Sequence, residues 1–331
     1  MVNAAKRYLP ASLVIQNLKK LSKGPCVTVL TLIPFLMKFN HIHFIINPAS
    51  GKEEPVLFYI NQVLNDSGIN WDIAVTRKNE SSGDIARELL GKTDLVAVYG
   101  GDGCVTAVAR ALHGTAMPMA IIPGGTANVM ARELGVPLET RAAIELLLPG
   151  HWQVKAIDMG TMNGEPFLLR VNLGIMADMV LQADRELKDY FGRLAYGVAA
   201  VKTMADAQPV LYQLEIDGEN IIETAVSLTV TNSGNIGIGD FSLQPGISVT
   251  DGLLDVILLK DNSIISVLKI AGSALLQNET DALMHWQCSQ IVIRLNQMQT
   301  FICDDSEQRA KELTIKVVPA SIKIVVPAEI K

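Results

Sequence analysis

Two short glycine-rich segments lie about twenty residues apart, and each joins an apolar run to a helical pattern. The apolar run at residues 95–99 ends in Gly100-Gly101-Asp102-Gly103, and the run at residues 119–122 ends in Pro123-Gly124-Gly125-Thr126. A strand, a glycine turn and a helix, repeated in this way, is typical of a doubly wound α/β sheet, in which both turns lie at the carboxyl ends of strands. The sequence therefore predicts two ligand-binding turns at one edge of a parallel sheet.

The composition of these turns favours phosphate as the ligand. Glycine lets the backbone approach a ligand with no Cβ in the way, and a helix N-terminus offers unpaired N–H groups. Asp102 would repel a bare phosphate, so we expect it either to act with a divalent cation or to orient a neighbouring group. The alternative is a pair of tight turns, because Asp-Gly is common in turns of any kind.

Two familiar phosphate-binding motifs are excluded. No Gly-Lys-Ser/Thr follows either turn, so neither is a Walker loop, and the glycine spacing differs from that of dinucleotide-binding folds. The strand at residues 41–46 ends in Asn47-Pro48-Ala49-Ser50-Gly51, which suits a third phosphate turn.

Composition limits the other possibilities. The chain of 331 residues has room for two domains, and 49% of its residues are hydrophobic. The four cysteines form no Cys-x-x-Cys pair, which argues against a zinc site or a disulfide framework and favours a reducing, cytoplasmic compartment. A net charge of −6 makes general nucleic-acid binding an unfavourable hypothesis.

Residues 1–40 differ from the rest of the chain. They carry six basic residues and no acidic one, which leaves 22 basic and 34 acidic residues elsewhere. This extension is an amphipathic segment that rests on an anionic membrane surface, an ordinary packing helix, or the product of a start codon placed too far upstream. The first alternative places the protein peripherally at the inner membrane face.

The pattern of secondary structure changes near residue 151. Strands and helices alternate over residues 41–150, whereas short strands with Gly and Asn turns dominate residues 151–312. We therefore expect a Rossmann-like α/β domain followed by an antiparallel β-sandwich domain. Residues 183–204 and 262–276 read as helical inserts, and residues 313–326 as a closing strand interrupted at Pro319.

The ordered motifs resemble those of the diacylglycerol kinase catalytic domain, a family of lipid kinases distantly related to NAD kinases. The resemblance rests on the stretches at residues 47–51, 100–103 and 123–128, and it continues through 188–196 and 234–255. It implies an ATP-dependent kinase whose second domain offers a pocket to a lipid such as diacylglycerol. It also implies that the closing strand, residues 313–327, returns to the first domain.

The resemblance also assigns roles to individual residues. It implies ATP with Mg²⁺ as cofactors and a structural metal site formed by the Asp251 side chain with the backbone of Ser248 and Leu253. The residues that would bind the nucleotide are Asn47, Thr76, Gly100, Gly101, Asp102, Gly103, Cys104, Val105, Thr106, Gly125, Thr126 and Asn128.

The catalytic residues implied by the resemblance are Asp102 and a carboxylate that acts as base near the acceptor hydroxyl. The family's Asp-Gly-Glu motif aligns with Asp305-Ser306-Glu307, and Glu307 is the predicted base if this turn carries one extra residue. Asp305 and Asp304 are the alternatives. Without the resemblance, an exposed acidic turn would be the simpler interpretation.

Several residues depart from the family pattern. Cys104 replaces a Thr, Thr106 and Ala107 stand where Asn and Glu are common, Val129 replaces an Asp, and Ser306 replaces a Gly. These changes leave two other hypotheses open, a kinase for a soluble acceptor and a non-catalytic protein that binds nucleotide or lipid. A homodimer also remains open.

Overall fold

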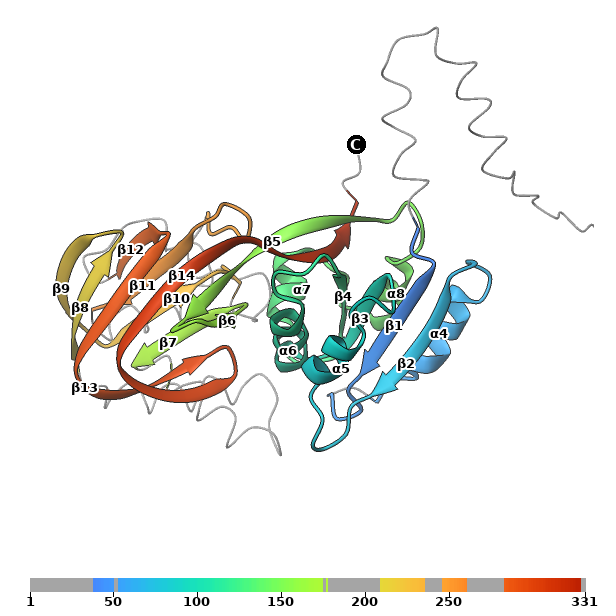
Figure 1. Ribbon diagram of the computed structural model, residues 1–331, viewed down its shortest axis with the longest axis horizontal. Helices are drawn as coiled ribbons and strands as arrows, with labels where there is room; N and C mark the ends of the chain where they lie inside the picture. Colours follow the sequence, from blue (N-terminus) through green and yellow to red (C-terminus); the bar gives the residue numbers. More distant parts are fainter. Residues whose placement is uncertain are drawn as a thin grey trace, which may run out of the picture.

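The computed structural model describes residues 38–50, 53–174, 177, 209–235, 246–260 and 283–328. Most of the N-terminal extension, both helical inserts and part of the stretch at 234–245 therefore lie outside the described residues. The described chain forms two lobes, an α/β domain and a β domain, joined by strands that run through both (Figure 1).

The α/β domain contains a parallel sheet in the order β14-β4-β3-β1-β2. The predicted alternation of strands and helices is confirmed. Its elements are β1 (His41–Ile46), α4 (Val56–Leu64), β2 (Asn70–Val75), α5 (Ser82–Glu88), β3 (Leu95–Gly100), α6 (Asp102–Leu112), β4 (Pro118–Pro123), α7 (Val129–Glu133) and α8 (Thr140–Glu145).

The helices form two layers around this sheet. The chain moves outward from β1 to β2 and then back across β1 to β3, so right-handed crossovers place α4 and α5 on opposite faces. In keeping with this arrangement, α5 packs on α6 and α4 packs on α8. The strands β3 and β4 are almost entirely buried between these layers, as expected for continuous apolar runs in a parallel sheet.

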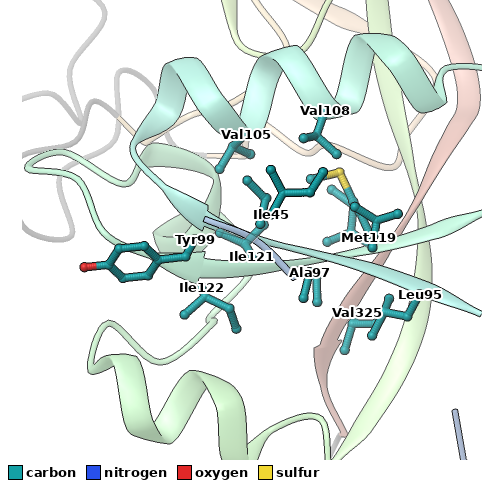
Figure 2. Close-up of a cluster of buried hydrophobic side chains, with 14 of the residues drawn as sticks. Ile45, Leu95, Ala97, Tyr99, Val105, Val108, Met119, Ile121, Ile122 and Val325 are labelled. Carbon is teal, nitrogen blue, oxygen red and sulfur yellow. The ribbon is translucent and has the colours of Figure 1, made fainter. Parts of the chain in front are cut away.

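Figure 2 shows how the first core is built. Val105 and Val108 on α6 face Ile45 and Ile121 of the sheet, and all four side chains are buried. Tyr99, at the end of β3, points away from this cluster (Figure 2). The carboxyl ends of the strands are thus held by a close-packed core, which gives the glycine turns a rigid base.

The β domain is an antiparallel assembly of strands, as predicted. Its elements are β5 (Trp152–Met162), β6 (Glu165–Phe167), β7 (Arg170–Gly174), β8 (Val210–Ile216), β9 (Glu219–Ala225), β10 (Ser227–Thr231), β11 (Leu254–Leu259), β12 (Leu283–Cys288), β13 (Gln290–Cys303) and β14 (Ser306–Pro327). A second buried cluster fills its interior. Within the described residues, no helix is both long and apolar enough to cross a membrane.

The closing strand is longer than the sequence suggested. β14 pairs with β13 and β5 in antiparallel register, and its far end pairs with β4 in parallel through Lys323 and Ile324. The break expected at Pro319 is a bulge within one strand, where Ala320 has a φ of 50°. A bulge accommodates the missing proline N–H without ending the strand.

Candidate functional site

The two predicted glycine turns lie in direct contact at the carboxyl ends of β3 and β4. The N–H of Gly124 donates to the carbonyl of Gly100 at 2.9 Å. A Cβ added to Gly125 would lie 2.5 Å from the Cα of Gly101, closer than real Cβ atoms approach backbone. The glycines therefore permit a contact between backbones that any side chain would prevent.

The first turn opens the N-terminus of α6. Gly101 precedes the helix in an extended conformation, and no side chain caps it. The Cys104 N–H already donates to the carbonyl of Gly101, so the N–H groups of Asp102 and Gly103, with the positive end of the dipole of this 11-residue helix, are the ones suited to an anion. This is the arrangement that the sequence predicted for phosphate.

Asp102 orients the second turn. Its Oδ1 accepts the N–H of Val129 at 2.7 Å, at the first residue of α7. Burial raises the pKa of Asp102, whereas hydrogen bonds from the backbone at the start of α7 act in the opposite direction. Of the two roles considered for this carboxylate, the contact supports that of orienting a neighbouring group.

The second turn is shaped by Asn128. This residue has a left-handed φ of 50°, and its side chain bonds the N–H and carbonyl of Gly125 at 3.0 and 2.8 Å. Asparagine tolerates this conformation better than most residues. Thr126, between them, is exposed.

The Cys104 thiol is the hydrogen-bond partner of another predicted site residue. The Asn47 side-chain amide donates to Cys104 Sγ at 3.0 Å, and the Asn47 N–H donates to the carbonyl of Tyr99. The thiol therefore occupies the place where a Thr hydroxyl is usual and still accepts a hydrogen bond. Sulfur is the weaker acceptor.

Three other residues were predicted to bind the nucleotide: Val105, Thr106 and Thr76. The side chains of Val105 and Thr106 are buried, the Thr106 hydroxyl donates to the carbonyl of Gly103, and the Val105 N–H donates to the carbonyl of Gly101, so these groups serve the helix itself. Thr76 follows β2 and donates its N–H to Ile46.

An open pocket of about 840 Å³ adjoins the turn that follows β1, the third predicted phosphate turn. Its lining is mostly apolar and includes Ile46, Ser50, Glu54, Phe58, Val75 and Tyr99. The Tyr99 ring also lies against Gly124, and burial raises the pKa of its hydroxyl. The pocket thus extends from Tyr99, the residue before the first glycine turn, toward Val75 at the end of β2.

The second domain contributes a turn of β13–β14 to the same place. Ser306 pairs with Cys303, so Asp304 and Asp305 form the two-residue turn between them. An Oδ2 of Asp305 lies 3.0 Å from the point that a Cβ on Gly103 would occupy. Glu307 is exposed and pairs with Ile302, one step along the same strand.

Asp304 serves the structure of this turn. Its carboxylate accepts the N–H groups of Leu168, Leu169 and Arg170 at 2.8–3.1 Å and also pairs with Arg110 of α6. Its side chain is 1% exposed. A carboxylate so occupied is a poor base, which leaves Asp305 as the alternative to Glu307.

Sequence reasoning missed two arginines at this junction. Arg170 is half-buried, and its Nη2 donates to the carbonyl of Asn235. Desolvation lowers the pKa of its guanidinium, while the nearby charges of Asp102, Asp304 and Glu133 raise it. Arg110 contacts the turn from α6. Neither arginine belongs to a recognisable motif, because their partners lie far away in the sequence.

The loop of the predicted structural metal site contains one exposed carboxylate. Asp251 Oδ1 accepts the N–H of Leu253 at 3.0 Å, and the Ser248 hydroxyl contacts Thr250. No cluster of three His, Cys, Asp or Glu residues occurs among the residues that the structure describes. Mg²⁺ binds through one or two carboxylates and keeps several waters, so this donor set fits a loosely held ion.

Comparisons with known proteins match both domains. Residues 41–162 match the diacylglycerol kinase catalytic domain, and residues 170–326 match the YegS C-terminal NAD kinase beta sandwich-like domain. An uncharacterised protein of Synechocystis is 30% identical over 323 residues, which cover 91% of this chain and 74% of that protein.

Two relatives whose names include diacylglycerol kinase agree with the family match. A diacylglycerol kinase of Bacillus subtilis is 28% identical over 70% of this chain and 77% of its own length. The crystal structure of a putative diacylglycerol kinase from Bacillus anthracis superimposes with a TM-score of 0.76 at 25% identity, covering 88% of this chain and 98% of that one. The chain belongs to the diacylglycerol kinase catalytic-domain family.

Proposed function

We propose that this protein is an ATP-dependent lipid kinase that transfers the γ-phosphate of ATP to a hydroxyl group of a lipid such as diacylglycerol. Family membership makes it a phosphotransferase that acts on a hydroxyl group. The observation that carries the finer proposal is the meeting of two glycine turns with a carboxylate turn from the other domain. This meeting supports the proposal, because groups suited to each substrate of a phosphoryl transfer would then lie side by side.

The nucleotide would lie along the glycine turns. The uncapped N-terminus of α6 suits its phosphates, and the apolar pocket beside Tyr99 and Val75 suits its base. Mg²⁺ would arrive bound to the phosphates and neutralise their charge. Asp102 supports this site indirectly by holding the start of α7.

The acceptor hydroxyl would enter from the second domain. A carboxylate near that hydroxyl takes its proton as the bond to phosphorus forms. We assign this role to Glu307, with Asp305 as the neighbouring alternative. Both residues belong to the turn that approaches Gly103.

The base is tested by Glu307→Gln and Asp305→Asn, with Glu312→Gln as a matched control. Glu312 is an exposed carboxylate on the same strand and pairs with Arg294. Loss of the base should lower kcat by about 10²–10⁴-fold and leave ATP affinity unchanged. A Glu307→Gln enzyme with normal kcat beside an inactive Asp305→Asn enzyme would transfer the assignment to Asp305.

The acceptor class is tested by supplying labelled ATP with diacylglycerol in anionic vesicles, with vesicles lacking diacylglycerol, and with NAD in solution. We expect label in the lipid only. The relatives named as diacylglycerol kinase and YegS-like lipid kinase support a lipid acceptor. Label in the soluble acceptor alone would overturn the proposal.

The same proposal places the protein in the cytoplasm, at the inner membrane face, where its substrate lies. It predicts that the protein sediments with vesicles that contain diacylglycerol. The basic extension at residues 1–40 would add an electrostatic contribution, and salt should weaken it.

A further inference from the structure

Arg110 lies on the face of α6 that meets the second domain. Gly103, Ala107 and Arg110 are spaced by four and three residues, so they form one stripe along the helix. Side chains in a helix lean toward its N-terminus, which directs the long Arg110 side chain over Ala107 toward Gly103.

The guanidinium contacts both carboxylates of the β13–β14 turn. Its Nη2 lies 2.9 Å from Asp304 Oδ2 and 3.7 Å from Asp305 Oδ1. The Asp304 side chain is 1% exposed, so its pair with Arg110 is screened less than a surface pair, whereas Asp305 is exposed. Its Nε is buried and has no hydrogen-bond partner among the residues described here.

The other contacts of the β13–β14 turn show why the contact with Arg110 matters for the position of the turn. Three backbone N–H groups at residues 168–170 hold Asp304 to the second domain. Of the contacts described at this turn, the ion pairs of Arg110 are those that join it to the helix bearing the first glycine turn. Without Arg110, the position of Asp305 over Gly103 would depend on the second domain alone.

We propose that Arg110 is a positioning residue for phosphoryl transfer, which holds the carboxylate turn of the second domain over the first glycine turn. The inference rests on the proposed kinase function. It assigns Arg110 no contact with substrate: Arg110 acts through Asp304 and Asp305, and so sets where the acceptor base meets the phosphate.

The test compares Arg110→Gln and Arg110→Lys with Arg141→Gln. Arg141 lies on α8 in an exposed pair with Glu145, so it controls for the loss of one arginine. Arg110→Gln should lower kcat for lipid phosphorylation by about 10–100-fold, because small displacements of reacting groups are that costly. KM for ATP should change by less than about twofold, since ATP binds on the α6 side of the contact.

The conservative variant separates positioning from folding. Lysine keeps the charge but reaches one carboxylate at a time, so Arg110→Lys should recover part of the lost kcat. Arg141→Gln should match the wild type. A folded Arg110→Gln enzyme with wild-type kcat, or one whose loss appears only in KM for ATP, would overturn the inference.

A double variant tests the route of the effect. If Arg110 acts through the turn, Arg110→Gln should lower kcat by a smaller factor in an Asp305→Asn background than in the wild type, because the contact with Asp305 is already lost and only the pair with Asp304 remains to be removed. Losses that multiply independently would contradict it. A wild-type protein that binds ATP but labels no lipid would instead contradict the proposed function, and this inference with it.

Discussion

Asp102 is the residue through which the two glycine turns act as one unit. Its carboxylate is partly buried and accepts the first N–H of α7, so a charge on the first turn fixes the start of the second helix. Burial disfavours the ionised form and raises the pKa of this group in the folded protein. Ionisation of Asp102 therefore opposes folding.

This behaviour predicts how Asp102→Asn changes stability with pH. Above its ordinary value of 3.8 the Asp102 carboxyl ionises readily in the unfolded chain but not in the folded one, so the wild type loses stability as pH rises from 3.8 through the raised folded pKa. Asparagine does not titrate. In urea unfolding, the free energy of unfolding of Asp102→Asn minus that of the wild type should be larger at about pH 7 than at about pH 4. A difference that is constant or reversed would contradict the burial of this charge.

At the scale of elements, the two glycine turns differ in how much room each leaves for a side chain. A Cβ on Gly125 would meet the Cα of Gly101 at 2.5 Å, whereas a Cβ on Gly101 would meet the Cα of Gly125 at 3.4 Å. The first approach forces the backbone to move, and the second is an ordinary contact.

Gly125→Ala should consequently lower the free energy of unfolding by about 1–3 kcal/mol, as overpacking does. Gly101→Ala should lower the free energy of unfolding by clearly less. Urea unfolding of both variants without nucleotide makes the comparison, and equal losses would show that the turns do not touch as described.

The elements that the sequence predicted well are those with local signals. The glycine turns, the parallel strands before them and the helices after them follow from hydrophobic runs and turn residues. The strand β12 (Leu283–Cys288) was not predicted, because its half-buried residues give no clear alternation. The sequence also failed to predict that one strand continues through Pro319. Strand pairing before and after this proline keeps the chain extended, although proline itself tends to end a strand.

The site was predictable only on the nucleotide side. Asp102 and the glycines stand in one short segment, but Arg110 and Asp304 are 194 residues apart and meet only in the folded chain. No spacing rule connects such residues. For the same reason the sequence left Asp304 and Asp305 as equal alternatives, whereas the structure shows that Asp304 is fully engaged.

At the scale of the whole molecule, two long strands tie the domains together. β5 pairs along nearly its whole length with the second half of β14, and β14 ends in the parallel sheet beside β4 (Figure 1). Separating the domains would break these ladders, so we expect one cooperative unfolding transition even for a chain of 331 residues.

The tryptophans allow this prediction to be tested. Trp71 and Trp152 belong to the first core and Trp286 packs on the second. In a Trp286→Phe protein, fluorescence follows the first domain while far-UV circular dichroism follows both. The two urea transitions should coincide, and separate midpoints would show that the domains unfold independently.

The most direct test of the central claim is transfer of radiolabelled γ-phosphate from ATP to diacylglycerol in vesicles with Mg²⁺, run beside Asp102→Ala. The proposed kinase predicts a labelled lipid that the wild type forms and the variant does not, because Asp102 joins the two phosphate turns. A wild-type protein that binds ATP and labels no lipid would contradict it.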